Sequence, residues 1–365
     1  MSGEKTGEEA LVRAIRALTA AAGEAGGVRV GIGDDCAVLA PRAGASLLAT
    51  TDLLLEDVHF RRRWAEPADI GWKSLAVNLS DIAAMGGRPR WALVALACPE
   101  GTSAEEVEAF YEGALSLARS HNVAIVGGDT AASPAGWLVN VTVLGEALAP
   151  RLRSTARVGD AVAVTGALGR SAAGLAVLER GLAPAEVAPA QLAEVTAAHL
   201  RPRPRVPEGE WLGSAGGVTA MMDLSDGLGI DLPRLLGESG VGASVDLDRL
   251  PIDDATRAVA SALGADPTAW ATGGGEDYEL LLTCEPVALA RLQRGLVEAC
   301  GTHLTAIGEV TAIPPVRWSA GGREVVAVRG YEHFATRLAA RAGASLTPSP
   351  TKATFENVFT LSFFP

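Results

Sequence analysis

Lysine is almost absent from this chain, because only three of its 31 basic residues are lysines, namely Lys5, Lys73 and Lys352. A Walker-type phosphate loop needs the pattern GxxxxGK[ST], and none of the three lysines follows a glycine. Acidic residues number 43, which gives a net charge of -12. This balance argues against a surface that binds nucleic acid or an anionic membrane. Any phosphate chemistry here therefore depends on metal ions and a few arginines.

The cysteine patterns of disulfide-rich and zinc proteins are also missing. The four cysteines, Cys36, Cys98, Cys284 and Cys300, form no CxxC pair, so we expect reduced and mostly buried thiols. No segment has about 18 consecutive apolar residues, the length that a membrane-spanning helix needs. The N-terminus lacks the basic-then-apolar pattern of a signal peptide. We therefore expect a soluble protein of the cytoplasm.

Other short motifs of nucleotide, calcium and hydrolase sites are incomplete or absent. GIGDDC begins like a dinucleotide-binding loop but lacks its third glycine. DLDRLPIDD has no glycine at the sixth position of a calcium loop. No G-x-S-x-G elbow occurs. These observations leave carboxylates as the chemically notable residues.

The alternation of elements predicts two α/β domains. At 365 residues with 48% hydrophobic content, the chain is long enough for two cores. Apolar spacing predicts helices over 69–85 and 103–122, the second with a capping box of Ser103 and Glu106. The segment RPRPRVPEG (201–209) is typical of a proline-rich connection. We place the domains at residues 1–150 and 151–340, followed by an atypical proline-rich and then apolar tail at 341–365.

A subset of acidic residues lies beside glycine or at the ends of apolar strands, where sheets present their ligand-binding edges. These residues are Asp34, Asp35, Asp52, Asp129, Asp223, Asp226, Glu276 and Asp277, and Asp81 joins them from a helix. Any single Asp-Gly pair is more often a turn than a ligand. Several converging carboxylates would repel one another unless cations bind between them, and hard oxygen ligands suit Mg²⁺.

The helix segment NLSDIAAMGG (78–87) contains the most unusual of these carboxylates, because Asp81 lies in an otherwise apolar helix. A buried carboxylate requires a partner. The spacing predicts that Leu79 and Ile82 pack the helix, whereas Asn78 and Asp81 share the opposite face. We expect that face to form the edge of a metal and phosphate site.

Seven motifs together resemble the thiamine-monophosphate kinase family, in the family's order and spacing, over residues ~10 to 335. They are GIGDDCAVL, TTDLLLEDVHF, KSLAVNLSDIAAMGG, VGGDT, LSDGL, GGGEDYELLLT and GYEHF. The wider superfamily includes aminoimidazole ribonucleotide synthetase and selenophosphate synthetase. The resemblance implies an N-terminal ATP-binding α/β domain that dimerises through its mixed sheet, a C-terminal α/β domain, and a homodimer. The implied reaction is Mg²⁺-assisted, direct in-line transfer of the ATP γ-phosphoryl group to thiamine monophosphate, giving thiamine diphosphate.

Position by position, the resemblance also implies the site residues. Metal-binding places match Asp35, Thr50, Thr51, Asp52, Asp81, Asp129, Asp223 and Asp226. Nucleotide-contacting places match Tyr111, Gly128, Asp129, Arg153 and Ser225, and substrate-contacting places match His59, Glu276 and Tyr331. Of these, Asp52, Asp81, Asp129 and Asp226 are the expected catalytic residues. Tyr111 also lies on the apolar stripe of its helix, so core packing is an equal interpretation of that residue.

Two alternatives remain open from the sequence. The first is another ATP-dependent enzyme of the same superfamily. Selenophosphate synthetases carry a reactive cysteine in an N-terminal segment, whereas this chain has no cysteine before Cys36. The second alternative is a non-catalytic, metal-stabilised ligand-binding protein. Clustered carboxylates would be costly to such a protein without a reaction to serve.

Overall fold

Two mixed sheets carry the fold in the computed structural model, which describes residues 14–19, 26–32, 36–181, 186–326 and 330. All of these described residues belong to one compact unit. The predicted α/β class is confirmed, because helices alternate with mixed sheets along the chain. The domain boundaries at 150 and 340 stay a prediction, and the tail at 341–365 lies outside the described residues. Within the described ranges, no helix has the length and apolar character to cross a membrane.

The smaller mixed sheet has four strands in the order β3-β6-β4-β5. The strands are β3 (Ser46–Leu55), β4 (Arg88–Pro99), β5 (Ala124–Ser133) and β6 (Leu138–Ala147). β6 runs antiparallel to both neighbours, whereas β4 and β5 are parallel. Asp52 is paired with Val141, which is buried, and Thr51 with Thr142. Because side chains alternate along a strand, Asp52 and Thr51 point to opposite faces.

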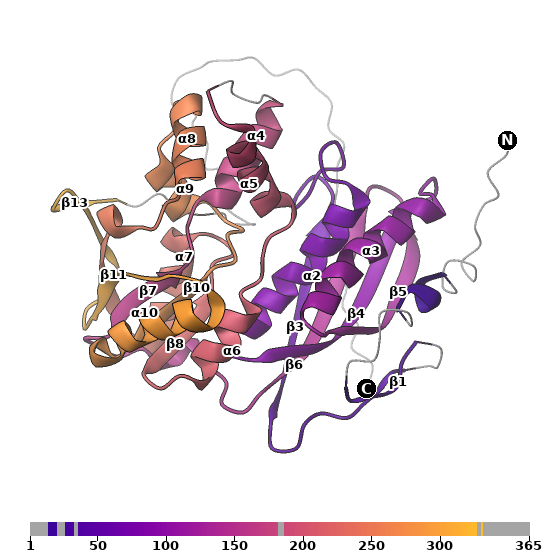
Figure 1. Cartoon of the computed structure of the whole chain (residues 1–365), viewed down its shortest axis with the longest axis horizontal. Helices are drawn as coiled ribbons and strands as arrows, with labels where there is room; N and C mark the ends of the chain where they lie inside the picture. The colour runs from indigo at the N-terminus through magenta and orange to yellow at the C-terminus, as the bar shows by residue number, and fades with distance from the viewer. Residues whose placement is uncertain (1–13, 20–25, 33–35, 182–185, 327–329, 331–365) are drawn as a thin grey trace, which may run out of the picture. The chain divides into compact units, whose positions relative to one another are not determined.

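Two helices, α2 (Pro67–Ala84) and α3 (Ala104–Ser120), pack against each other, and α2 contacts β3 and β6 (Figure 1). The predicted capping box is present, because the Glu106 N–H donates to the Ser103 hydroxyl and Ser103 N–H to the Glu106 carboxylate. Glycines allow the two helices to approach closely. A Cβ at Gly71 would lie 1.9 Å from the Phe110 carbonyl oxygen, and one at Gly113 would lie 1.9 Å from that of Ala68. Close helix contact therefore requires glycine at both positions.

The larger sheet has seven strands in the order β13-β12-β9-β11-β7-β10-β8. They are β7 (Ala161–Thr165), β8 (Val218–Asp223), β9 (Gly242–Asp246), β10 (Leu280–Cys284), β11 (Leu304–Thr311), β12 (Arg317–Ala320) and β13 (Arg323–Val325). Two further strands, β1 (Val28–Val30) and β2 (Val38–Leu39), form a separate two-stranded sheet. Both faces of β7 are buried: Ala163 packs in one hydrophobic core and Val162 in another. The first core also contains the apolar residues of α2 and β3, so it is continuous from the smaller sheet to the larger one.

The remaining helices come from the same half of the chain as the larger sheet. They are α4 (Arg170–Arg180), α5 (Pro189–Leu200), α6 (Val206–Ser214), α7 (Leu228–Ser239), α8 (Asp254–Leu263), α9 (Pro267–Gly273) and α10 (Pro286–Cys300), with short 3₁₀ turns η1 (Arg153–Thr155) and η2 (Leu247–Arg249). α2 contacts α6 and β8 as well as its own sheet. It is therefore buried on nearly every side, with Asn78 and Ser80 both fully enclosed.

Candidate functional site

The C-terminal half of α2 contacts the inner face of β3 through a hydrogen bond between polar side chains. Thr50 and Asp52 lie two residues apart on β3 and so point to the same, helix-covered face. The Thr50 hydroxyl donates a hydrogen bond of 2.5 Å to the Asp81 carboxylate. Asp81 is half-buried on a helix whose neighbouring residues are almost all enclosed. Its first partner is therefore a hydroxyl from the adjacent strand.

The next residue back on α2 contacts the other sheet. Ser80 donates a hydrogen bond of 2.6 Å to Asp223, which is the last residue of β8 and only 3% exposed. Ser80 and Asp81 are consecutive residues of α2, and one contacts the larger sheet while the other contacts the smaller sheet. They thus bring Asp223 of the larger sheet near Asp52 of the smaller sheet. Asp52, Asp81 and Asp223, which were predicted from separate motifs, form one neighbourhood here; we call these three residues the aspartate cluster.

The aspartate cluster holds more negative charge than its protein surroundings neutralise. Burial and then the neighbouring Asp81 raise the pKa of Asp52 to about 7, and the same two causes raise the pKa of Asp223 to about 8. Burial raises the pKa of Asp81, while the Thr50 hydrogen bond and the charge of Arg153 oppose that rise. Among the described residues, no three acidic, histidine or cysteine side chains converge closely enough to hold a metal by themselves. Ligands such as phosphate oxygens or water would have to complete such a site.

Stability should therefore depend on pH in a distinctive way when divalent cations are removed. We expect the Tm to fall as the pH rises from about 6.5 to about 8.5, because the folded state retains protons that the unfolded chain has already released. Asp52 and Asp277, each with a pKa raised by burial to about 7, and Asp223 at about 8 titrate in this window. His199, whose pKa burial lowers to about 4, acts with the opposite sign but at lower pH.

The measurement is thermal unfolding in EDTA at a series of pH values. Asp223→Asn is the matched variant, since it removes the group with the highest of these pKa values and should reduce the slope above pH 7. A Tm that rises steadily across the window would contradict the assignment of protonated carboxyl groups at this site.

The loop after β8 is organised by a buried acid that sequence reasoning missed. One carboxylate oxygen of Asp231 accepts the backbone N–H groups of Ser225, Asp226 and Gly227, at 3.0, 2.9 and 3.1 Å. Asp231 is fully buried, and its other oxygen accepts from Arg234 at 3.2 Å. Arg234 also forms an ion pair with Asp226. The buried Asp231 carboxylate therefore holds the backbone at two predicted site residues, Ser225 and Asp226.

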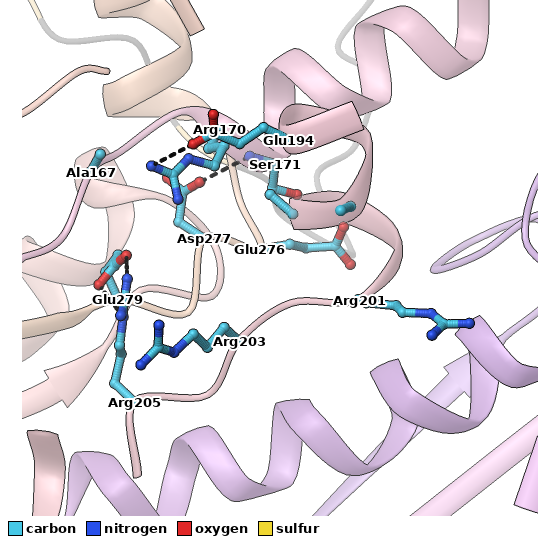
Figure 2. A pocket seen from close by; sticks show the side chains of 12 residues that line it. Ala167, Arg170, Ser171, Glu194, Arg201, Arg203, Arg205, Glu276, Asp277 and Glu279 are labelled. Atoms are coloured by element: carbon cyan, nitrogen blue, oxygen red, sulfur yellow. Dashed lines mark hydrogen bonds and ion pairs between the residues drawn. The ribbon is translucent and has the colours of Figure 1, made fainter. Parts of the chain in front are cut away.

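A pocket of about 210 Å³ lies beside the segment that precedes β10. Its lining carries both charges, with four arginines and four acidic residues: Arg170, Arg201, Arg203, Arg205, Glu194, Glu276, Asp277 and Glu279 (Figure 2). The neighbouring side chains of Glu276 and Asp277 point in different directions in this pocket (Figure 2). Asp277 accepts from the N–H of Gly169 at 2.6 Å, and so joins the loop before α4. Glu276 contacts Lys73 of α2.

Two of the predicted residues lie on the far edge of the smaller sheet. Gly128 and Asp129 belong to β5, which the strand order separates from β3 by three inter-strand steps, or on the order of 14 Å. The pairing register also puts Asp129 on the face of the exposed Leu53, opposite to Asp52. The structure therefore does not bring Asp129 together with the aspartate cluster within one chain.

The other predicted residues are distributed around this site. Tyr111 is 3% exposed and packs edge-on against Phe110 in the core, which favours the packing interpretation of that residue. Thr51 lies on the outer face and bonds to the hydroxyl of Thr142. The His59 ring accepts from the Leu55 N–H at 3.0 Å. Arg153 lies in η1, and Asp35 and Tyr331 lie outside the described residues.

Three residues to which the sequence motifs assigned no role hold the predicted site residues in place. Ser80 and Lys73 occur inside the motif KSLAVNLSDIAAMGG, and Asp231 follows the motif LSDGL. A signal was present, because each is a polar residue within a helix whose other positions are largely apolar. Such residues are expected to have a partner. Their partners belong to distant segments, however, and only the fold identifies them.

Known proteins resemble this chain over most of its length. The family model described as AIR synthase related protein, N-terminal domain, matches residues 33–147, and the corresponding C-terminal domain matches residues 157–317. The thiamine-monophosphate kinase of Salmonella typhimurium is 38% identical over 315 residues, which are 85% of this chain and 93% of that protein.

Solved structures agree with the sequence comparison. The crystal structure of thiamine-monophosphate kinase from Stenotrophomonas maltophilia K279a is 39% identical, covers 87% of this chain and 98% of its own, and superposes with a TM-score of 0.76. The structure of AaThiL complexed with AMPPCP and TMP is 32% identical, with 92% and 99% coverage and a TM-score of 0.70. The two-domain AIR synthase-like fold expected from the motifs is therefore confirmed.

Proposed function

The chain belongs to the thiamine-monophosphate kinase family, and we propose that it transfers the γ-phosphoryl group of ATP to thiamine monophosphate, giving thiamine diphosphate. The observation that carries this proposal is the likeness over nearly the whole chain to AaThiL, a structure complexed with AMPPCP and TMP. AMPPCP is a non-transferable analogue of ATP, so that relative was captured with both a nucleotide and TMP. The aspartate cluster and the Glu276 pocket give this chain chemically suitable places for the two substrates.

Catalysis of this reaction requires mainly that the protein position the two substrates and stabilise the negative charge on the transferring phosphoryl group. The acceptor is a phosphate oxygen that is already ionised at neutral pH, so no strong general base is needed. We propose a direct in-line transfer, in which positioning and electrostatic stabilisation supply most of the rate. Arg153, whose charge acts on Asp81 and Asp223, is the protein cation best placed to compensate negative charge near the transferring group.

The donor chemistry of the aspartate cluster fits Mg²⁺. Its carboxylates are close enough to raise one another's pKa, and removal of that repulsion is what a bound cation supplies. Asp52, Asp81 and Asp223 would hold the ion with water and phosphate oxygens, and Mg²⁺ would neutralise charge on the phosphates. Metal roles for Asp35, Thr50, Thr51, Asp129 and Asp226 remain part of the same proposal.

We also propose a homodimer that buries the outer face of the smaller sheet. The face opposite to α2 exposes Leu47 at 53%, Leu53 at 47% and Leu93 at 36%. Apolar side chains gathered on one sheet face are typical of an association surface. Asp129 lies on this face, so in such a dimer it would lie at or beside the interface between the two copies.

The remaining roles are inferred from the family. ATP would contact Tyr111, Gly128, Asp129, Arg153 and Ser225, and thiamine monophosphate would contact His59, Glu276 and Tyr331. Tyr111 is 3% exposed in the core, so its contact with ATP is the least supported of these assignments by the structure. We place the enzyme in the cytoplasm, where its four unpaired cysteines would stay reduced.

The test is incubation of the pure protein with ATP, Mg²⁺ and thiamine monophosphate, followed by chromatographic separation of the thiamine phosphates. The proposal predicts thiamine diphosphate that accumulates with time and requires all three components. Thiamine monophosphate that binds but is never converted would support a ligand-binding protein instead. Conversion only of a different phosphorylated acceptor would indicate another enzyme of the superfamily.

A further inference from the structure

Lys73 is a buried cation in the middle of α2. It is 3% exposed, and it is the only one of the three lysines that lies among the described residues. An ammonium group removed from water is stable only if charged or polar groups compensate it. A lysine at this position of an apolar helix therefore has a specific reason, which its contacts supply.

The two partners of Lys73 come from separate segments of the chain. Its Nζ donates to the His59 carbonyl oxygen at 2.9 Å, in the connection that follows β3. It also forms an ion pair of 2.8 Å with Glu276 Oε1, in the segment that precedes β10. His59 and Glu276 are both residues that we assign to the thiamine substrate. One ammonium group therefore connects both substrate-contacting segments.

The other side of Glu276 does not provide an equivalent cation. Glu276 Oε2 lies 3.2 Å from His199 Nδ1, and that nitrogen also lies 3.0 Å from the Ser171 hydroxyl. Burial lowers the pKa of His199 to about 4, so the ring is neutral near pH 7. Burial alone would raise the pKa of Glu276, but Lys73 and then His199 hold it below its usual range. The carboxylate therefore stays ionised chiefly because of Lys73.

The backbone at Glu276 also requires support. Its φ is +66°, in the left-handed region that non-glycine residues rarely adopt. Tyr278, two residues later, has a φ of +50°. Such conformations persist where surrounding contacts fix them, and they concentrate at ligand sites. The Lys73 ion pair is one of the contacts that fix this segment.

We propose that Lys73 is a positioning residue for the thiamine substrate, which sets the charge and orientation of Glu276 and the place of His59 together. The inference rests on the proposed function, because it takes Glu276 and His59 as the substrate contacts. Thiamine carries a cationic ring, for which an ionised and oriented carboxylate is a suitable partner. Lys73 itself has no polar contact with the aspartate cluster, so its effect should be confined to the thiamine side of the site.

The first experiment compares steady-state kinetics of the wild type with Lys73→Met. We expect kcat/KM for thiamine monophosphate to fall about 100-fold, the scale of a misplaced binding group, while the KM for ATP changes less than about threefold. Lys73→Arg, which keeps the cation, should recover part of the loss. Arg90→Met is the matched control, because it breaks a partly buried ion pair of 2.8 Å with Glu146 away from this pocket. It should leave both KM values unchanged.

A second experiment needs no variant of Lys73. With only three lysines in the chain, wild-type protein labelled with ¹³C at the lysine ε-carbon gives three side-chain signals. Replacing Lys5 or Lys352 with arginine identifies two of them and leaves Lys73 by elimination. Thiamine monophosphate added without ATP should shift the Lys73 signal and leave the other two in place. This measurement decides the question even if Lys73→Met fails to fold.

The outcomes separate this inference from the proposed function. If the wild type forms no thiamine diphosphate and binds no thiamine monophosphate, the proposed function fails. If the wild type is active, an unshifted Lys73 signal on saturation with thiamine monophosphate would overturn the positioning role. A folded Lys73→Met protein with an unchanged kcat/KM for thiamine monophosphate, or with equal falls in kcat/KM for both substrates, would also overturn it.

Discussion

Asp81→Asn is expected to lower turnover by at least about 100-fold, the scale of losing a principal electrostatic contribution at a transition state. Asp81 is the central member of the aspartate cluster: its charge acts on both Asp52 and Asp223. Asparagine keeps the size and one oxygen of the side chain but removes the charge that Mg²⁺ and phosphate chemistry require. The reaction should therefore suffer far more than substrate binding.

The fold should survive this change. The oxygen that accepts from Thr50 is preserved in asparagine, and the repulsion that raises the neighbouring pKa values disappears. We therefore expect a Tm equal to or above that of the wild type in the absence of divalent cations. Circular dichroism and thermal unfolding check this expectation before any rate is compared.

Asp160→Asn is the matched control for Asp81→Asn. Asp160 is 4% exposed and likewise accepts from a threonine hydroxyl, that of Thr219 at 2.6 Å, but it precedes β7 away from the cluster. Turnover per folded enzyme should stay near the wild-type value in this control. An unchanged rate for Asp81→Asn, or an equal loss in both variants, would remove Asp81 from the catalytic site.

Arg205→Met should produce the largest loss of stability among single substitutions that we consider, about 3–5 kcal/mol. Arg205 is 8% exposed, and its guanidinium donates to both carboxylate oxygens of Glu279, at 2.7 and 2.5 Å. It also donates to Glu208, which is fully buried, at 3.1 Å. Removal of the arginine leaves the buried Glu279 without its cation and leaves Glu208 with only Arg203, at 3.8 Å, which is more costly than the loss of an exposed ion pair.

The measurement is the change in urea midpoint and m-value on unfolding. Arg205→Lys is the matched variant, since it retains the charge but cannot form the two-pronged contact with Glu279. We expect it to lose less than Arg205→Met. A loss of under about 1 kcal/mol for Arg205→Met would mean that this buried group contributes no more than a surface pair.

Local patterns predicted the individual elements well. The capping box at Ser103 fixed the start of α3, and α2 begins and ends within two residues of its predicted limits of 69 and 85. These signals are local, because caps and apolar periodicity depend on residues within a few positions. The predicted connection at 201–209 was partly wrong, because α6 begins at Val206. Proline is well tolerated in the first turn of a helix, where its missing N–H is not needed.

Burial was harder to predict than secondary structure. The cysteines were expected to be mostly buried, but Cys284 is the buried one, whereas Cys36 is exposed and Cys98 and Cys300 are intermediate. Asn78 was expected to share with Asp81 the face that forms the edge of the site, yet it is fully buried and its amide donates to the Ser74 carbonyl oxygen of its own helix. α2 is covered by α6 and β8 on the side that the sequence left open. Those covering elements lie more than a hundred residues away.

In the candidate site, too, local motifs identified individual residues but not their distant partners. Motifs identified Asp52, Asp81 and Asp223, and the fold brings these three together. Motifs could not reveal that Asp129 belongs to the opposite edge of the sheet, because strand order is set by non-local pairing. The partners of Glu276 were likewise hidden, since Lys73 precedes it by about two hundred residues.

Transfer from ATP labelled with ³²P at the γ position tests the central claim most directly. In the presence of Mg²⁺ and thiamine monophosphate, the label is predicted to appear in thiamine diphosphate, with one ADP formed for each labelled product. Asp81→Asn run in parallel should show the same binding of thiamine monophosphate and almost no labelled product. Thiamine monophosphate bound by the wild type without any label transferred, or ADP formed without thiamine diphosphate, would contradict the account.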